Sequence, residues 1–339
     1  MGLKAKLAEL NSDLDARLRG LVAATDSCDR YYNMMAYHLG WLNERFDIQD
    51  GNHGKRLRPC LCLLVHESLT GAVDKAVPAA MAVELVHNFS LVHDDIQDNS
   101  HHRRSRPTVW SVWGAPHAIN VGDGLLALAY AALASHDLTP EHVCRGTRAL
   151  SQAVMSLCEG QFLDMTLQAE PGLGLDRYRA MIARKTGALF GCAARLGALT
   201  ADAPPHVEEG LHDFGRLLGE AFQMHDDVAG VWGDTKTTGK PARDIQERKC
   251  GLPAVIASAR ALGPDARRLI ALYARSAPLE EDETHWVLDL FRRLEVREEA
   301  EATARETLRR AEKALDEVAP PGTASESLRD LLSLIRAQG

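Results

Sequence analysis

The sequence predicts an all-α protein in which residues 1–339 form one large helical domain. Apolar residues recur three and four positions apart along most of the chain, which is the spacing of the buried face of a helix. Hydrophobic residues make up 45% of the chain and aromatic residues only 5%, as expected for a large core of packed Ala- and Leu-rich helices. The apolar and polar alternation typical of strands is nowhere long enough to support a sheet.

Charge and composition exclude several classes of function. The formal net charge is -8 and no basic stripe offsets it, so the sequence lacks the footprint of a nucleic-acid-binding protein. The seven cysteines show neither zinc-ligand spacing nor an even-numbered disulfide framework, so we expect reduced thiols and a cytoplasmic location. No signal-peptide h-region is visible, and the longest apolar run is far shorter than the ~20 residues that cross a bilayer, so we expect no membrane span.

Turns and polar loops divide the chain into successive helices. Leucines spaced alternately four and three residues apart predict the first helix, and Gly, Pro or polar clusters bound the later ones. The predicted helical ranges are 3–21, 29–46, a helix from GKRLRP to the loop at 70–74, 78–98, 118–135, 139–169, 177–199 and 206–229, with further helices over 253–338. Between them, residues 230–251 form a long polar loop, and loops of this length often close over a substrate.

The segment GKRLRP, residues 54–59, places three cations at the start of an apolar helix. Lys55, Arg56 and Arg58, together with the backbone amides of a helix N-terminus, would bind an anion such as diphosphate. The alternative is an ordinary solvated basic surface.

Three carboxylates stand within the apolar stretch ELVHNFSLVHDDIQDNSHHRR, residues 84–104. Asp94 and Asp98 are four positions apart and project from one side of a helix, with Asp95 beside them. Such close like charges need water or a cation, and hard oxygen ligands without His or Cys suit Mg²⁺. A solvated acidic face is the alternative for this motif alone.

A second acidic pair favours the metal interpretation. The run FQMHDDVAGVWGD ends an apolar helix at Asp226 and Asp227. Two acidic helix ends can face each other across a cavity, and Mg²⁺ held in this way keeps coordination positions for substrate phosphate oxygens.

Other polar residues accompany the acidic motifs. His87 lies two turns before Asp94 on the same face, where it is either a core residue or a ligand. The adjacent Arg103 and Arg104 can point to opposite sides and so serve two separate anions. Lys185 interrupts an apolar helix, where a snorkelling side chain is the alternative.

Taken together, these motifs resemble the trans-isoprenyl diphosphate synthase (polyprenyl synthetase) family over nearly the whole chain. GKRLRP, DDIQD with the following RR and PT, KTG at Lys185, FQMHDD and the later GK and K stand in the family's order and spacing. The resemblance implies the isoprenoid synthase fold, an all-α bundle around a deep central cavity, with bound Mg²⁺ and assembly as a homodimer. It also implies condensation of isopentenyl diphosphate with an allylic diphosphate to a C15–C20 product, of which geranylgeranyl diphosphate is favoured.

The resemblance assigns roles residue by residue. Asp94, Asp95 and Asp98 would hold Mg²⁺ against the allylic diphosphate, and Asp226 and Asp227 would hold a further ion. Asp94, Asp95, Lys185, Asp226 and Lys240 form the expected catalytic set. The allylic diphosphate would be bound by Arg103, Lys185, Thr186, Gln223, Lys240 and Lys249, isopentenyl diphosphate by Lys55, Arg58, His87 and Arg104, and product length would be set near Phe89 and Ser90.

The sequence departs from the family at three places, one of which is Trp110, where a His is common. Gly230 stands where the second acidic motif normally has a third Asp, for which Asp234 would compensate only if the loop folds back. Ser105 replaces the usual Gly after the arginine pair. Two other functions stay open: a class I terpene cyclase, which would not need a second diphosphate site, and an inactive regulatory subunit, which would be free to lose both charged sets.

Overall fold

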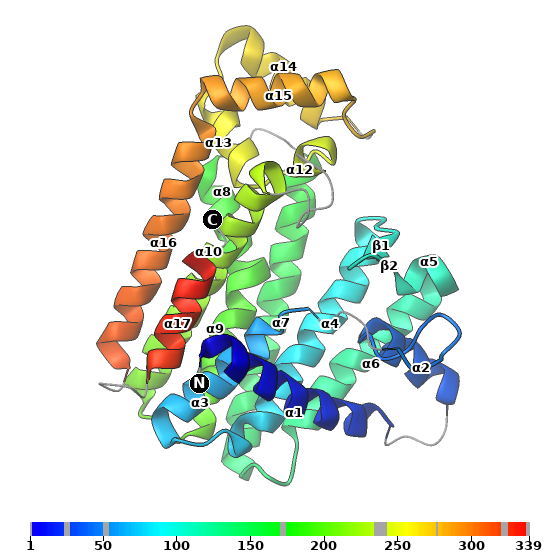
Figure 1. Cartoon of the computed structure of the whole chain (residues 1–339), viewed down its shortest axis with the longest axis vertical. Coiled ribbons are helices and arrows are strands. Elements are labelled where there is room, and N and C mark those ends of the chain that lie inside the picture. The colour runs from blue at the N-terminus through cyan, green and yellow to red at the C-terminus, as the bar shows by residue number, and fades with distance from the viewer. Residues whose placement is uncertain are drawn as a thin grey trace. The chain divides into compact units, whose positions relative to one another are not determined.

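The computed structural model describes residues 2–23, 28–49, 54–169, 174–233, 243–275, 277–319 and 325–336, and these are almost entirely helical (Figure 1). The all-α prediction is therefore confirmed. The strands within these ranges are β1 (His102–Arg103) and β2 (Arg106–Pro107), which pair as a hairpin too short to show as alternation in the sequence. Among the described helices, none has the length and apolar character needed to cross a membrane.

The chain divides into two compact units, each built from segments distant in sequence. The first contains Met1–Ser151, Cys192–Glu208 and Pro320–Ser325, and the second contains Gln152–Gly191, Glu209–Ala319 and Glu326–Gly339. The single domain over residues 1–339 stays a prediction, because a division into compact units does not show that either folds alone.

The first unit is organised around helix α4, which is buried along most of its length. It packs against α3 and α6, and α6 approaches closely because Gly122 lacks a side chain: a Cβ there would lie 2.2 Å from Nε2 of His93. The helices of this unit are α1 (Leu3–Ala23), α2 (Asp29–His38), α3 (Leu57–Thr70), the short η1 (Asp74–Ala76), α4 (Val77–Gln97), α5 (Val109–Trp113) and α6 (Ala115–Leu133).

The second unit has a core formed by Tyr178, Ile182, Met224, Val287 and Leu290 with their neighbours. Helix α13 packs against α8 and α16 in this unit. Its helices are α8 (Leu175–Ile182), the π-helical turn η2 (Ala183–Gly187), α12 (Arg243–Gln246), α13 (Leu252–Arg260), α14 (Gly263–Tyr273), α15 (Glu281–Arg293), α16 (Val296–Val318) and α17 (Glu326–Arg336), whereas α7 (Pro140–Ala169), α9 (Ala188–Thr200) and α10 (Pro205–Trp232) contribute residues to both units.

The predicted boundaries differ from the structure most at two places. The helix predicted over 29–46 ends at His38, because Gly40 adopts a φ of 88° and the chain then turns so that Leu42 and Ile48 form an isolated bridge. Within the predicted polar loop at 230–251, α10 continues to Trp232 and residues 243–246 form α12.

Candidate active site

Three carboxylates lie at the C-terminal end of α4. Asp94 and Asp95 belong to its last turn, and Asp98 caps it, donating its backbone N–H to the Asp94 carbonyl over 2.8 Å. Negative charge is unfavourable at this end, because the helix dipole is itself negative there. Asp95 is only 2% exposed, and its burial raises its pKa, a shift that the guanidinium of Arg103 opposes. A nearby cation would therefore stabilise this end of α4.

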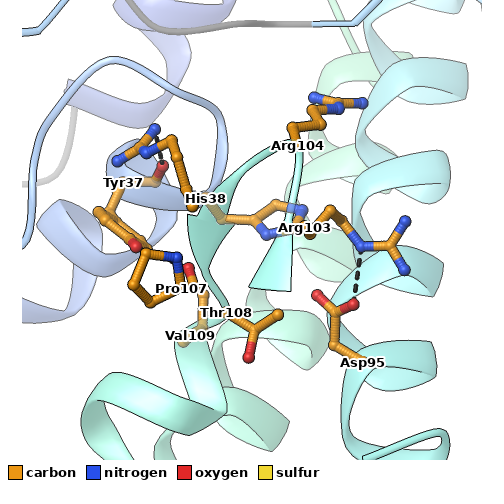
Figure 2. A pocket seen from close by; sticks show the side chains of 9 residues that line it. Tyr37, His38, Asp95, Arg103, Arg104, Pro107, Thr108 and Val109 are labelled. Atoms are coloured by element: carbon orange, nitrogen blue, oxygen red, sulfur yellow. Dashed lines mark hydrogen bonds and ion pairs between the residues drawn. The ribbon is translucent and has the colours of Figure 1, made fainter. Parts of the chain in front are cut away.

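The hairpin after α4 directs its two adjacent arginines toward different partners. Nε of Arg103 donates to Oδ1 of Asp95 over 2.7 Å (Figure 2). The guanidinium of Arg104 instead lies so close to Gly54 that a Cβ there would be 2.6 Å from Nη2. The turn residues Arg104 and Ser105 have φ of 52° and 64°, a conformation that favours glycine and accounts for the usual Gly at the second position. The divergence expected of the arginine pair is thus present.

A cationic set forms beside this hairpin. Nη1 of Arg58 lies 3.4 Å from Nε2 of His87, and because an arginine only donates, the histidine nitrogen must accept. Burial lowers the pKa of His87 well below its ordinary value, and the charges of Arg58 and Arg104 act in the same direction. Lys55 is exposed and directly follows Gly54, against which Arg104 rests. The residues predicted to bind isopentenyl diphosphate therefore gather in this part of the first unit.

Arg56 departs from the prediction that all three GKRLRP cations would meet an anion. Its side chain is buried, with Nη2 2.5 Å from Oδ1 of Asp15 and Nε 3.6 Å from Oε1 of Glu84. Glu84 also accepts a hydrogen bond from Nδ2 of Asn88. Arg56 therefore joins α1 to α4 through the half-buried Asp15 and the buried Glu84, and the anion-binding role is left to Lys55 and Arg58.

A pocket below the hairpin contains residues that the sequence reasoning missed. Figure 2 shows the imidazole of His38 reaching from α2 toward the strand that carries Arg103. Its Nε2 is buried and has no hydrogen-bond partner among the described residues, and burial together with the hairpin arginines lowers its pKa to about 3. Arg106 holds the hairpin to the end of α2 by donating to the carbonyl of Tyr37 over 3.3 Å, and to the following loop by donating to the carbonyl of Leu42 over 2.6 Å. Within a predicted helix that ran to residue 46, His38 gave no signal of its own.

The second acidic pair divides into two different environments at the C-terminal end of α10. Asp226 is exposed, whereas Asp227 is only 9% exposed. Oδ2 of Asp227 accepts from the hydroxyl of Tyr178 at 2.6 Å and from the backbone N–H of Leu252 at 2.9 Å, and Oδ1 accepts from Nε2 of Gln223 at 2.8 Å. Burial raises the pKa of Asp227 to about 6 despite these donors. Asp227 thus links α8, α10 and α13, and its metal role stays a prediction.

The predicted Thr186 and Gln223 belong to the same hydrogen-bonded chain. The hydroxyl of Thr186 donates to Oε1 of Gln223 over 2.9 Å, and Gln223 then donates to Asp227. Thr186 and Lys185 stand on the π-helical turn η2, a local irregularity that often marks functional positions. Lys185 pairs with Asp164 on α7, at 2.5 Å between Nζ and Oδ2.

Asp164 and its neighbour Gln161 were also missed from the sequence. The side chain of Gln161 is 6% exposed, and neither its Oε1 nor its Nε2 has a hydrogen-bond partner in the described part of the chain. Gly160 allows α7 to approach η2, since a Cβ there would lie 2.2 Å from the backbone nitrogen of Lys185. Because α7 also carries Gln152 and Glu159, the local sequence did not single out Gln161 or Asp164.

The lysines predicted in the polar loop have different outcomes. Lys249 is described, and its Nζ lies 2.8 Å from Oδ1 of Asp244 and 3.3 Å from Oε2 of Glu247. Lys240 and Asp234 lie outside the described residues. Their predicted roles are therefore unaltered by the structure.

The two residues predicted to set product length, Phe89 and Ser90, lie on α4 about one turn before Asp94. Phe89 is 6% exposed, and its ring meets that of His93 edge to face, with 4.8 Å between centroids. The hydroxyl of Ser90 donates to the carbonyl of His87 over 2.8 Å. Phe89 is thus the bulky side chain of this pair.

The donor atoms of both acidic sets fit Mg²⁺. They are carboxylate oxygens, the type of ligand that hard cations prefer. Among the described residues, no three His, Cys, Asp or Glu side chains are grouped so that they would hold an ion. Magnesium commonly retains water and binds through one or two carboxylates plus substrate phosphates, so a sparse protein ligand set is compatible with it.

Comparison with known proteins agrees with this arrangement. The family model described as polyprenyl synthetase matches residues 40–291. The chain is 43% identical over 239 residues to a (2E,6E)-farnesyl diphosphate synthase of Mycobacterium tuberculosis, in a match that covers 70% of this chain and 66% of that protein, just under two thirds of its length. It is 44% identical over 248 residues to a geranylgeranyl diphosphate synthase of the same organism, covering 73% of this chain and 70% of that one.

The fold comparison extends over nearly the entire chain. The crystal structure of a polyprenyl synthetase from Streptomyces coelicolor A3(2) superposes with a TM-score of 0.91 at 34% sequence identity, covering 98% of this chain and 99% of that chain. Similarity in sequence and in fold therefore leads to one conclusion: the chain belongs to the polyprenyl synthetase family.

Proposed function

We propose that the chain is a Mg²⁺-dependent prenyltransferase that condenses isopentenyl diphosphate with an allylic diphosphate to a C15–C20 product. The observation that carries the proposal is the arrangement of two charged sets. One set is acidic, lies near the C-terminal ends of α4 and α10, and would bind a diphosphate through Mg²⁺, whereas the other comprises the cationic Arg58 and Arg104 with the neutral His87. Relatives named as farnesyl and geranylgeranyl diphosphate synthases support the same chemistry.

The first task of the site is to ionise the allylic carbon–oxygen bond. Negative charge grows on the departing diphosphate, so preorganised cations stabilise the transition state more than the ground state. Lys185, Arg103 and Lys249 supply this charge in the proposal, although each is paired with a carboxylate in the structure. When bound, Mg²⁺ adds positive charge at the leaving oxygens. Diphosphate binding would therefore exchange carboxylates for phosphate oxygens around these side chains.

The second task is to hold isopentenyl diphosphate in position. Arg58 and Arg104 bind its diphosphate in the proposal, with Lys55 adding charge at the exposed edge. Neutral His87 accepts from Arg58 and so fixes the direction of that guanidinium. The double bond then attacks the allylic cation, a new carbon–carbon bond forms, and the proton lost from isopentenyl diphosphate passes to the departed diphosphate.

Product length is set in the proposal by the space beside α4 one turn before Asp94. Phe89 precedes Asp94 by slightly more than one turn and is bulky and buried. We favour a C20 product, in line with the relatives named as geranylgeranyl diphosphate synthases.

The proposal includes assembly as a homodimer in the cytoplasm. Helix α7 exposes apolar side chains at Met155, Phe162 and Met165, which lie 63%, 69% and 45% exposed. Exposed apolar residues grouped on one helix are suited to burial against a protein partner. Light scattering of the purified protein would test the dimer.

The decisive test is an incubation with Mg²⁺, labelled isopentenyl diphosphate and each of dimethylallyl, geranyl and farnesyl diphosphate. Products are analysed by length before and after phosphatase treatment. A C20 alcohol that appears only after phosphatase supports the proposal and its favoured length. Hydrocarbon formed from an allylic diphosphate alone would instead indicate a cyclase, and absence of any product would contradict both.

A further inference from the structure

His38 lies behind the cationic set and has no part in the mechanism described so far. Its ring reaches from the end of α2 into the pocket beneath the hairpin, which Asp95, Arg103 and Arg104 also line (Figure 2). Nε2 of His38 is shielded from solvent and meets no hydrogen-bond partner within the described ranges. A buried nitrogen in this state costs free energy, because it has lost its hydrogen bonds to water without replacing them. Such an atom requires an explanation.

The side chain of Asn88 indicates which ring nitrogen of His38 carries the proton. Nδ2 of Asn88 donates to the carbonyl of Glu84 over 2.8 Å and to its Oε1 over 2.9 Å, so the amide meets its other neighbours through its oxygen. Burial lowers the pKa of His38, and its interaction with the Asn88 side chain opposes this shift, as donation by the histidine does. Because Nε2 has no partner in the described part of the chain, the donor is Nδ1. Neutral His38 therefore presents the lone pair of Nε2 to the pocket.

Arginines supply the hydrogen-bond donors around this lone pair. Arg106 donates to two backbone carbonyls, and Arg103 donates to Asp95. Next to burial, the charge of Arg104 has the largest effect in lowering the pKa of His38. A guanidinium has several N–H donors and no acceptor, so it is complementary to an imidazole lone pair. The unpaired acceptor of His38 thus shares a pocket with an arginine that the proposed function assigns to isopentenyl diphosphate.

His87 shows the same kind of contact already formed, since its Nε2 accepts from Nη1 of Arg58 at 3.4 Å. Resting on the proposed function, we propose that His38 is a positioning residue for isopentenyl diphosphate: in the substrate complex its Nε2 accepts an N–H of Arg104 and fixes the plane of that guanidinium. Two neutral histidines then direct the two arginines of the site, one each. The bond from Arg104 satisfies Nε2 only when substrate is bound, so its free energy contributes to substrate affinity.

A neutral acceptor suits this task better than a carboxylate does. Asp95 accepts from Arg103 and at the same time neutralises part of its charge. His38 directs Arg104 without adding negative charge, so the full charge of this guanidinium acts on the diphosphate. Its fixed plane also favours paired hydrogen bonds to phosphate oxygens.

Two substitutions separate the roles of the ring nitrogens. The amide nitrogen in His38→Asn lies near the position of Nδ1 and keeps a donor for Asn88, whereas the amide oxygen in His38→Gln reaches the position of Nε2 and keeps an acceptor. Steady-state kinetics are measured with each diphosphate varied in turn. We expect His38→Asn to raise the KM for isopentenyl diphosphate about tenfold, the loss of one hydrogen bond to a charged group, with kcat and the KM for the allylic diphosphate unchanged. His38→Gln should recover most of this loss.

Two further variants exclude a purely structural effect. His102→Asn is the matched control, because His102 is an exposed histidine on the same hairpin, and it should leave both KM values unchanged. In an Arg104→Met background, His38→Asn should raise the KM for isopentenyl diphosphate no further. An unchanged KM in His38→Asn, an equal rise for both substrates, no recovery in His38→Gln, or a full additional effect in the Arg104→Met background would each overturn the inference.

Nuclear magnetic resonance of the unaltered full-length protein, with ¹⁵N-labelled histidine, tests the same point without a substitution in His38. Its resonances are identified by their absence from the spectrum of His38→Gln. We expect a proton on Nδ1 and, on addition of isopentenyl diphosphate, a shift of the Nε2 resonance to lower frequency, as occurs when an imidazole nitrogen accepts a hydrogen bond. A proton on Nε2, or no shift at saturation, would contradict the proposal.

Failure of the inference is distinguishable from failure of the proposed function. If the unaltered protein neither binds isopentenyl diphosphate nor elongates any allylic diphosphate, the proposed function fails and the inference fails with it. If it elongates prenyl chains but His38→Asn has an unchanged KM for isopentenyl diphosphate, only the role of His38 is refuted.

Discussion

The adjacent Lys55 and Arg56 should have different roles, Lys55 in binding substrate and Arg56 in stabilising the fold. A matched pair of substitutions tests this. Arg56→Met removes a guanidinium that is 2.5 Å from Asp15 and 3.6 Å from Glu84, whereas Lys55→Met removes an exposed ammonium next to it. Glu84 is 2% exposed, so loss of Arg56 leaves a buried carboxylate without its main opposing charge. Breaking a buried pair in this way costs about 3–5 kcal/mol, while an exposed substitution costs within about 0.5 kcal/mol.

The pH dependence of the loss follows from Glu84. Burial raises the pKa of Glu84, and Arg56 is the largest opposing influence, so Arg56→Met raises that pKa further. A carboxyl whose folded pKa exceeds its unfolded pKa contributes stability that is present below the unfolded value and is lost as pH rises through the folded one. We therefore expect the destabilisation by Arg56→Met to be larger at pH 8 than at pH 5.

The assay combines unfolding in urea, followed by circular dichroism without Mg²⁺, with the KM for isopentenyl diphosphate. Arg56→Met should unfold at much lower urea, and a double variant with Glu84→Gln should recover part of the loss. Lys55→Met should keep the stability of the unaltered protein but show a raised KM. Equal stabilities of the two single variants would refute the reasoning.

Three further predictions concern the acidic residues and the product. Burial raises the pKa of Asp227 to about 6, so the folded state favours the protonated carboxyl. Its contribution of about 3 kcal/mol to the free energy of unfolding is therefore present below pH ~4 and is lost as pH rises through 6. Metal-free Asp227→Asn should lack this part of the pH slope in urea titrations, and an identical slope would contradict the burial argument. Asp94→Asn should abolish turnover. It should also raise the melting temperature of the metal-free protein, because it removes a negative charge from the C-terminal end of α4, where the helix dipole disfavours it. Normal turnover would contradict the assignment of Asp94 as a metal ligand. Phe89→Ala should lengthen the product in chain-length analysis, whereas an unchanged distribution would place the cavity floor elsewhere.

Local patterns explain which parts of the site the sequence predicted. Asp94 and Asp98 follow the four-residue spacing of one helix face, and the order of the charged motifs identified the family. The inward direction of Arg56 depends instead on two distant carboxylates. Asp15 lies 41 positions before it on α1, and Glu84 lies on α4. No local spacing carries that information.

The same limit applies to the second acidic set. Asp226 and Asp227 are equivalent in the sequence, but only Asp227 meets donors from Tyr178 and Leu252, which arrive from other helices. A Cβ at Gly230 of α10 would lie 1.9 Å from Oδ2 of Asp244 on α12, and this approach likewise depends on packing between helices. Tertiary packing therefore gives neighbouring residues of one motif unequal roles.

The placement of carboxylates at the C-terminal end of α4 has a consequence for the protein in the cell. Asp94 and Asp95 stand in the last turn of this helix, where the helix dipole disfavours negative charge, so neutral or basic residues there would stabilise the empty protein. Binding of a cation with diphosphate would offset this loss, because it stabilises the folded chain. In a cell, abundance of such a protein would rise with its substrate supply, because anything that binds the folded state protects it from unfolding and proteolysis.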